Sequence, residues 1–212
     1  RAHPKFARYN DVKQGLAISS RIFTQAACDR IVGEAFKYAK KFGYKSVTIC
    51  EKPNVIRETS GMMLETGKRV QKDYPDIQLW NTNIDAQMMW LTKNPEDYGV
   101  VVAGNMFGDI ISDGFAGLVG GLGFACSGNI GDKVGVFEPS HGSAPKYKGL
   151  NKMNPFAMML SGVMMLRHLD EMQAADQLEG AIASVIEEGK TVTYDMKPDR
   201  DDPTAASTSE VA

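Results

Sequence analysis

Two aspartates at helical spacing are the strongest chemical feature of this sequence. Asp109 and Asp113 lie four residues apart in "NMFGDIISDG", and this spacing places both carboxylates on one face of a helix. Like charges this close repel each other, so a bound cation is one way to keep both ionised. Carboxylate oxygens suit Mg²⁺ or Mn²⁺ better than zinc. An equally weighted alternative is that both are first-turn acids that complement the helix dipole.

A loop over residues 138–149, "EPSHGSAPKYKG", brings together three side chains that could bind a ligand: His141, Lys146 and Tyr147. Its glycine, serine and proline residues keep the backbone out of a regular helix or strand. The imidazole, the cation and the phenol therefore have no periodic structural role, and the loop is interpreted as a ligand site.

Lys52 and Asp85 are weaker candidates when each is taken alone. Lys52 follows a β-branched strand, and α/β proteins place their sites at strand ends, so it is a candidate acid or base. Asp85 opens a short helix, where capping the helix N-terminus is the simpler interpretation.

Composition and missing motifs exclude several classes of protein. With 43% hydrophobic and 24% charged residues the chain can bury a core. The net charge of −2 argues against a nucleic-acid binder, and no apolar run is long enough to predict a membrane span. Three scattered cysteines do not suggest a disulfide framework. The glycine-rich segment 117–132 lacks the spacing and the preceding strand of a Rossmann fingerprint.

The apolar pattern predicts alternating helices and strands, and therefore an α/β fold with a largely parallel sheet. Residues 98–105 form a continuous apolar run, which is typical of a strand covered on both faces. The glycine-rich segment is interpreted as a domain crossing or as a loop against a ligand, and the polar tail after residue 197 is expected to fray. Helices are predicted at 24–42, 58–73, 85–94, 154–169 and 173–189, and strands at 45–50, 77–84, 98–105 and 134–139.

Three ordered blocks of sequence resemble the β-decarboxylating dehydrogenases, the isocitrate/isopropylmalate dehydrogenase family. "NMFGDIISDGFAGLVGGLGFACSGNIG" is similar to the Asn-Leu-x-Gly-Asp-Ile-x-Ser-Asp block of that family, and "EPSHGSAPKYKG" with a trailing Asn-Pro is similar to its cofactor loop. "EKPNVIRETSG" resembles its His-Lys-x-Asn block, with Glu51 where histidine is usual and Pro53 at a normally small position. The resemblance runs from about residue 15 to the end.

The resemblance implies a role for each matching residue. Asp85, Asp109 and Asp113 would hold Mg²⁺ or Mn²⁺, which acts as a Lewis acid on the substrate hydroxyl. Lys52 would be the acid/base group, aided by Asp85, and both would be contributed to the partner's site in a homodimer. The implied dinucleotide-binding residues are Asn54, His141, Gly142, Ser143, Ala144, Lys146, Tyr147, Asn154, Tyr194 and Asp195.

The cofactor loop favours NADP, with NAD as the alternative. NAD-using relatives typically carry an aspartate at the position of Lys146. Here Lys146-Tyr147, with Tyr194 in "KTVTYD", would suit a 2′-phosphate dianion. The basic residue expected shortly after Tyr194 is not cleanly in place, because Lys197-Pro198 stands there.

The resemblance implies the α/β/α fold of isocitrate and isopropylmalate dehydrogenases, not a Rossmann fold. The family's N-terminal third has no counterpart, so we expect a fragment. Residues 1–119 would be a small dimerisation and metal/catalytic domain, and residues 120–212 the C-terminal part of the large cofactor-binding domain.

The expected function is oxidative decarboxylation of isocitrate to 2-oxoglutarate and CO₂, a tricarboxylic acid cycle reaction. The alternatives are an NAD-dependent 3-isopropylmalate or homoisocitrate dehydrogenase, or a non-catalytic regulatory subunit. No nucleic-acid or membrane partner is expected. The expected location is cytoplasmic, with mitochondrial as the alternative.

Overall fold

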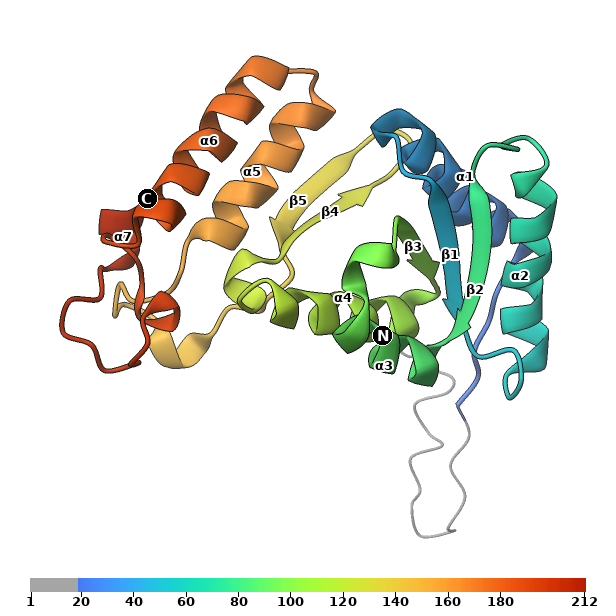
Figure 1. The fold of residues 1–212 in the computed structure, drawn as a ribbon, viewed down its shortest axis with the longest axis horizontal. Coiled ribbons are helices and arrows are strands. Elements are labelled where there is room, and N and C mark those ends of the chain that lie inside the picture. The colour runs from blue at the N-terminus through green and yellow to red at the C-terminus, as the bar shows by residue number, and fades with distance from the viewer. Residues whose placement is uncertain (1–18) are drawn as a thin grey trace, which may run out of the picture. The chain divides into compact units, whose positions relative to one another are not determined.

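The computed structural model describes residues 19–212 (Figure 1). Its internal contacts divide the chain into two compact units, with the division between Gly108 and Asp109. This point lies inside helix α4 (Asn105–Leu118), whereas the sequence suggests a boundary after residue 119. Among the described residues, no helix is both long and apolar enough to cross a lipid bilayer.

The first unit contains a parallel sheet with the strand order β2-β1-β3. In its register Glu51 pairs with Asn83 and Cys50 pairs with Ala103, so all three strands end at the same edge. Parallel neighbours need crossover connections, and a helix follows each of the first two strands. The elements in chain order are β1 (Ser46–Glu51), α2 (Arg57–Gln71), β2 (Gln78–Asn83), α3 (Ile84–Lys93) and β3 (Val100–Ala103).

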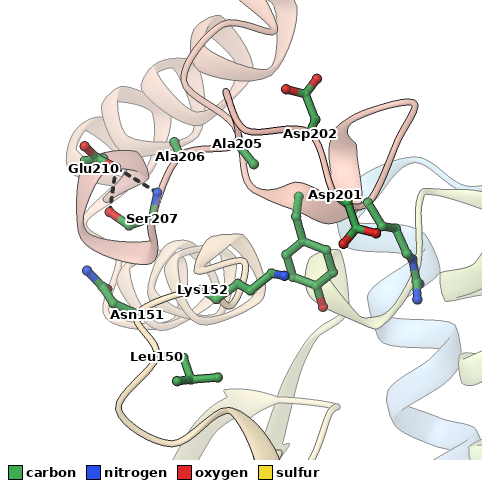
Figure 2. Close-up of a pocket in the computed structure, with 11 residues that line it drawn as sticks. Leu150, Asn151, Lys152, Asp201, Asp202, Ala205, Ala206, Ser207 and Glu210 are labelled. Carbon is green, nitrogen blue, oxygen red and sulfur yellow. Dashed lines mark hydrogen bonds between the residues drawn. The ribbon is translucent and has the colours of Figure 1, made fainter.

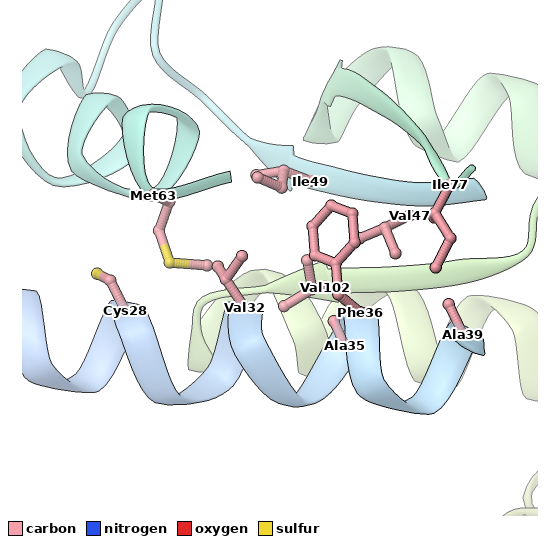
Figure 3. Close-up of a cluster of buried hydrophobic side chains, with 10 residues drawn as sticks. All are labelled: Cys28, Val32, Ala35, Phe36, Ala39, Val47, Ile49, Met63, Ile77 and Val102. Carbon is pink, nitrogen blue, oxygen red and sulfur yellow. The ribbon is translucent and has the colours of Figure 1, made fainter. Parts of the chain in front are cut away.

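Helix α1 (Gln25–Phe42) supplies much of the core of this unit. The Thr24 side chain caps its start by accepting a hydrogen bond from the Ala27 N–H, and Gly43 ends it at a φ of 77°. Val32 and Phe36 pack with Val47, Ile49 and other buried residues between the helices and the sheet (Figure 3). Every residue of β1 is buried, so packing on both faces restricts the movement of this central strand.

Strand β3 differs from its prediction. It lies at the edge of the described sheet, and within it Val102 alone is fully buried. The continuous run of valines therefore predicts the strand correctly but not its place at the edge of the described sheet. Edge and central strands can have the same composition.

The second unit is built on a helical hairpin that packs on a two-stranded antiparallel sheet. Helix α5 contacts both strands and helix α6. Its core residues include Phe156, Val163 and Ile182. The elements are β4 (Cys126–Ile130), β5 (Gly135–Pro139), α5 (Phe156–His168), α6 (Met172–Glu188) and the short α7 (Thr208–Val211).

Two predictions for this unit are wrong. The glycine-rich segment contains strand β4, which was missed because glycine weakens the strand signal. A Cβ atom at Gly128 would lie only 3.2 Å from the Phe137 ring, so close cross-strand packing favours glycine there. The tail is ordered, since Val211 is buried in the core and the Thr208 N–H donates to the Asn151 carbonyl at 2.8 Å.

Candidate functional site

The carboxyl edge of the parallel sheet holds an ion pair. Lys52 follows β1, and Asp85 lies in the first turn of α3, which follows β2. The Lys52 Nζ atom lies 2.5 Å from the Asp85 Oδ1 atom. The lysine side chain is 19% exposed and the aspartate 68% exposed, so a partly desolvated cation is held by an accessible anion.

Asp85 is not the helix cap that its sequence position suggests. Asn83 occupies the N-cap position of α3, and Asp85 is the second helical residue. The hydrogen bond from Lys52 is the largest influence on this carboxyl and holds its pKa below the usual value, with the backbone N–H of Ala86 acting in the same direction. The local fold therefore presents Asp85 as an ionised partner of Lys52.

Asp109 and Asp113 lie on one face of α4, as the spacing predicts, and both are exposed. Helix α4 begins at Asn105 and has no acidic residue in its first turn. The dipole interaction falls off within the first turn, so dipole compensation does not account for these two carboxylates. Their oxygen donors and their access to solvent fit Mg²⁺ or Mn²⁺.

Within residues 19–212, no three or more His, Cys, Asp or Glu side chains gather as the ligands of a metal ion would. Asp109 and Asp113 belong to the second compact unit and Asp85 to the first. The predicted metal site with three carboxylates, one of them contributed across a dimer interface, stays a prediction.

The loop after β5 has an irregular but defined backbone. Ala144 adopts the left-handed conformation, with a φ of 42°, before the 3₁₀ turn η5 (Pro145–Tyr147). The His141 Nδ1 atom lies 2.9 Å from the Gly142 carbonyl oxygen, which can only accept a hydrogen bond. Nδ1 therefore donates, and Nε2 is the ring nitrogen that remains for a ligand. Lys146 and Tyr147 are exposed.

The structure brings together the two tyrosines that the sequence assigns to the dinucleotide. Burial first, and then the neighbouring Tyr147 hydroxyl and the Asp195 carboxylate, raise the pKa of Tyr194. The Lys152 Nζ atom lies 4.5 Å from the centre of the Tyr194 ring, within cation–π range. Segments more than 40 residues apart in the sequence thus form one cluster of phenols and cations.

Asn154 and Asp195 have structural partners of their own. Asn154 is buried, and its amide donates to the Asp195 carboxylate at 3.0 Å and accepts from the Phe156 N–H at 2.9 Å. Asp195 also accepts from the Thr193 hydroxyl at 2.6 Å. This network joins the start of α5 to the segment that carries Tyr194. Asn54 lies exposed in the turn after Lys52.

A cavity of about 380 Å³ lies between residues 150–152 and the C-terminal segment (Figure 2). Lys152, Tyr194 and Arg200 line it, together with acidic and small residues of the C-terminal segment. Sequence reasoning missed Lys152 and Arg200, because neither belongs to a motif. It considered Lys197, whose Nζ instead lies 3.2 Å from the Lys190 carbonyl oxygen near the end of α6.

The model of one protein family, isocitrate/isopropylmalate dehydrogenase, matches residues 4–212. The chain belongs to the isocitrate/isopropylmalate dehydrogenase family. Its fold is the α/β fold of that family, as predicted. The chain is 39% identical to the crystal structure of isocitrate dehydrogenase from Methylococcus capsulatus, with a TM-score of 0.87 over 92% of this chain and 56% of that one.

Relatives within the isocitrate/isopropylmalate dehydrogenase family differ in their named substrates. The chain is 45% identical to the 3-isopropylmalate/3-methylmalate dehydrogenase of Methanocaldococcus jannaschii, over 85% of this chain and 56% of the relative. It is 42% identical to the NADP isocitrate dehydrogenase of Thermus thermophilus, over 85% of this chain and 36% of the relative. The chain spans about half the length of the first of these.

Proposed function

We propose that the full-length protein catalyses a metal-dependent oxidative decarboxylation of isocitrate, with NADP as the hydride acceptor. Membership of the isocitrate/isopropylmalate dehydrogenase family supports the reaction class. The observation that carries the choice of NADP is the cluster of Tyr147, Tyr194 and nearby cations.

The charges of this cluster suit a phosphate group. Two phenols can donate hydrogen bonds, and Lys146, Lys152 and Arg200 supply positive charge on neighbouring segments. A 2′-phosphate carries up to two negative charges, so charge-assisted hydrogen bonds would hold it. An aspartate in place of Lys146 would repel the same group.

Lys52 is proposed to be the acid/base group that acts on the substrate hydroxyl. General acid–base catalysis needs a titratable side chain within hydrogen-bond reach of the moving proton. Lys52 is a partly buried cation at the sheet edge, and its contact with Asp85 fixes the position of its ammonium group. Both residues would serve a site shared across a homodimer.

Asp109 and Asp113, with Asp85 contributed across that interface, would hold Mg²⁺ or Mn²⁺. The bound ion would stabilise negative charge on the substrate oxygen during hydride loss and decarboxylation. The two carboxylates of α4 would fix the position of the ion, since i, i+4 spacing keeps them on one helical face.

A second candidate is a 3-isopropylmalate dehydrogenase. Its support is the 45% identity to an archaeal relative named for that substrate. The substrates of the two candidate functions differ in the substituent that they carry and not in the chemistry at the hydroxyl group. Substrate choice must therefore be measured directly.

The test is a substrate and cofactor matrix on the full-length protein. Isocitrate and 3-isopropylmalate are each supplied with NADP or NAD, with Mg²⁺ or with EDTA, and reduction of the cofactor is followed at 340 nm. We expect Mg²⁺-dependent reduction of NADP with isocitrate. Reduction only with 3-isopropylmalate would establish the second candidate, and a strong preference for NAD would overturn the proposal for the phosphate cluster.

Asp109→Asn tests the metal proposal in the same assay. We expect turnover to fall on the order of 10²-fold or more, because one charged ligand is lost. Asp132→Asn, at an exposed aspartate in the turn between β4 and β5, is the matched control and should keep normal turnover. Normal Mg²⁺-dependent rates in Asp109→Asn would show that Asp109 is not a metal ligand.

A further inference from the structure

A charged carboxylate is buried at the end of the central strand, directly before Lys52. Glu51 is fully buried. Both of its oxygens lie 3.1 Å from the Arg21 Nη2 atom. The Arg21 guanidinium lies 4.5 Å from the centre of the Phe23 ring and 4.7 Å from that of the Phe107 ring. Two aromatic rings thus flank the guanidinium. The Glu51 carboxylate is screened from water, and the Arg21 side chain is 24% exposed.

Glu51 also connects the start of α2 and the end of β3 to its own strand. It accepts a hydrogen bond from the Ser60 hydroxyl at 2.8 Å and one from the Gly104 N–H at 2.9 Å. A Cβ atom at Gly104 would come within 2.6 Å of Arg21 and 2.8 Å of the Glu51 carboxylate. Glycine is therefore needed where β3 runs into α4.

The same hydroxyl reaches the backbone of Lys52. The Lys52 N–H donates to the Ser60 Oγ atom at 3.3 Å, and the Lys52 carbonyl accepts from the Ile56 N–H at 2.8 Å to close the following turn. One buried carboxylate therefore fixes the backbone on which Lys52 is mounted, through Ser60, and the strand beside it, through Gly104.

Net stability is a weak explanation for this arrangement. Burying two charges is costly, and apolar residues of similar size are often as stable or more stable in their place. The Glu51 carboxylate has three hydrogen-bonding partners, whereas the Nη1 atom of Arg21 is buried without one. A buried carboxylate with several partners instead specifies one geometry, since any displacement leaves its charge without a partner.

We propose that Glu51, held by Arg21, is a positioning residue for Lys52. The inference rests on the proposed function, in which Lys52 acts on the substrate hydroxyl. Glu51 does not itself reach substrate, because its carboxylate is buried and fully occupied by Arg21, Ser60 and Gly104. It acts by limiting the movement of the turn that follows β1.

The test uses the full-length protein in three variants. Glu51→Gln removes the charge, Arg21→Lys keeps the cation, and Arg21→Met with Glu51→Met replaces the pair by apolar side chains. The double variant is decisive, because it removes both charges together and so leaves no unpaired Arg21, yet it lacks the bonds to Ser60 and Gly104. Thr48→Val, at a fully buried residue of the same strand, is the control.

We expect kcat to fall on the order of 10-fold to 100-fold in Glu51→Gln and in the double variant. KM for the acid should change by less than about 3-fold, because the loss falls on the chemical step. Arg21→Lys should stay within about 3-fold of normal kcat, and Thr48→Val should equal the wild type. A stable double variant with normal kcat would overturn the proposal, since the pair would then be structural only.

Hydrogen exchange measured by mass spectrometry separates this inference from the proposed function. In the double variant, peptides covering residues 52–60 should exchange faster than in the wild type, while peptides from α5 stay unchanged. Unchanged exchange over residues 52–60 would overturn the positioning role whatever the activity. If the wild type oxidises none of the acids, the proposed function fails, and the exchange result still decides whether Glu51 fixes the turn.

Discussion

The two candidate regions are built in opposite ways. The edge that carries Lys52 rests on a strand in which every residue is buried, and its neighbouring carboxylate has three partners. The loop that carries Lys146 has an irregular backbone and exposed side chains. Its cluster is completed by segments from elsewhere in the second unit, through Tyr194 and Lys152.

This difference matches the two tasks proposed for the regions. An acid/base group must be held to a fraction of an ångström, since small displacements are costly for the chemical step. A phosphate subsite needs accessible cations that meet a flexible ligand, and it discriminates between ligands by charge. Changes at the sheet edge should therefore affect kcat, and changes at the loop should affect cofactor affinity.

The largest expected effect comes from Lys52→Met in the full-length protein. Loss of a general acid/base group typically costs 10²- to 10⁴-fold, so kcat should fall by about that factor while NADP affinity, measured by fluorescence titration, stays normal. Stability should change little, because the partner Asp85 is 68% exposed.

Lys68→Met is the control for Lys52→Met. Lys68 forms an exposed ion pair with Glu65 on α2, and its loss should leave kcat unchanged. Equal effects of the two variants on kcat would contradict the proposal that Lys52, at the sheet edge, is the acid/base group.

Lys146→Asp tests the loop after β5 and should change cofactor affinity. Removing the cation and adding an anion beside Tyr147 should weaken NADP binding on the order of 10- to 100-fold, by loss of a charge-assisted hydrogen bond and by repulsion. The kcat measured at saturating cofactor should change much less. Isothermal titration with NADP and NAD measures both affinities, and an unchanged ratio between them would contradict the role of the loop.

Asn154→Leu should reduce stability in the second unit. It leaves the Phe156 N–H and the Oδ2 atom of Asp195 without the hydrogen bonds that Asn154 makes, while Asp195 Oδ1 keeps its bond from Thr193, and such losses cost about 1–3 kcal/mol. Urea unfolding followed by circular dichroism measures the change. Unfolding at the wild-type midpoint would show that this network contributes no stability.

The smallest expected effect concerns the rate at which two cysteines are alkylated, one in each unit. Burial raises the pKa of Cys50 in β1 to about 11, so about 0.1% of this thiol is ionised at pH 8. Cys126 in β4 has a pKa raised in the same direction but is only partly buried. Iodoacetamide at pH 8 should therefore label Cys126 before Cys50, as peptide mass spectrometry would show.

Sequence patterns predicted the helices and strands of the first unit because each has a clear period and a clear end. Helix α1 begins after Thr24 and ends at Gly43, as expected from capping. Strand β4 escaped prediction because Gly128, which is needed for packing against Phe137, also weakens the local signal. The C-terminal tail was wrongly expected to fray because its anchor, Val211, is one apolar residue in a polar segment.

The sequence by itself determined the family, the α/β fold and the side chains that carry chemistry, because these depend on residue types at fixed spacings. Only the tertiary structure decided which of them meet. It paired Lys52 with Asp85, joined Tyr147 to Tyr194 and brought Lys152 and Arg200 to the same cavity. It also enclosed Glu51 with Arg21, a contact 30 residues apart. Such partners are chosen by packing across the fold, which no local pattern records.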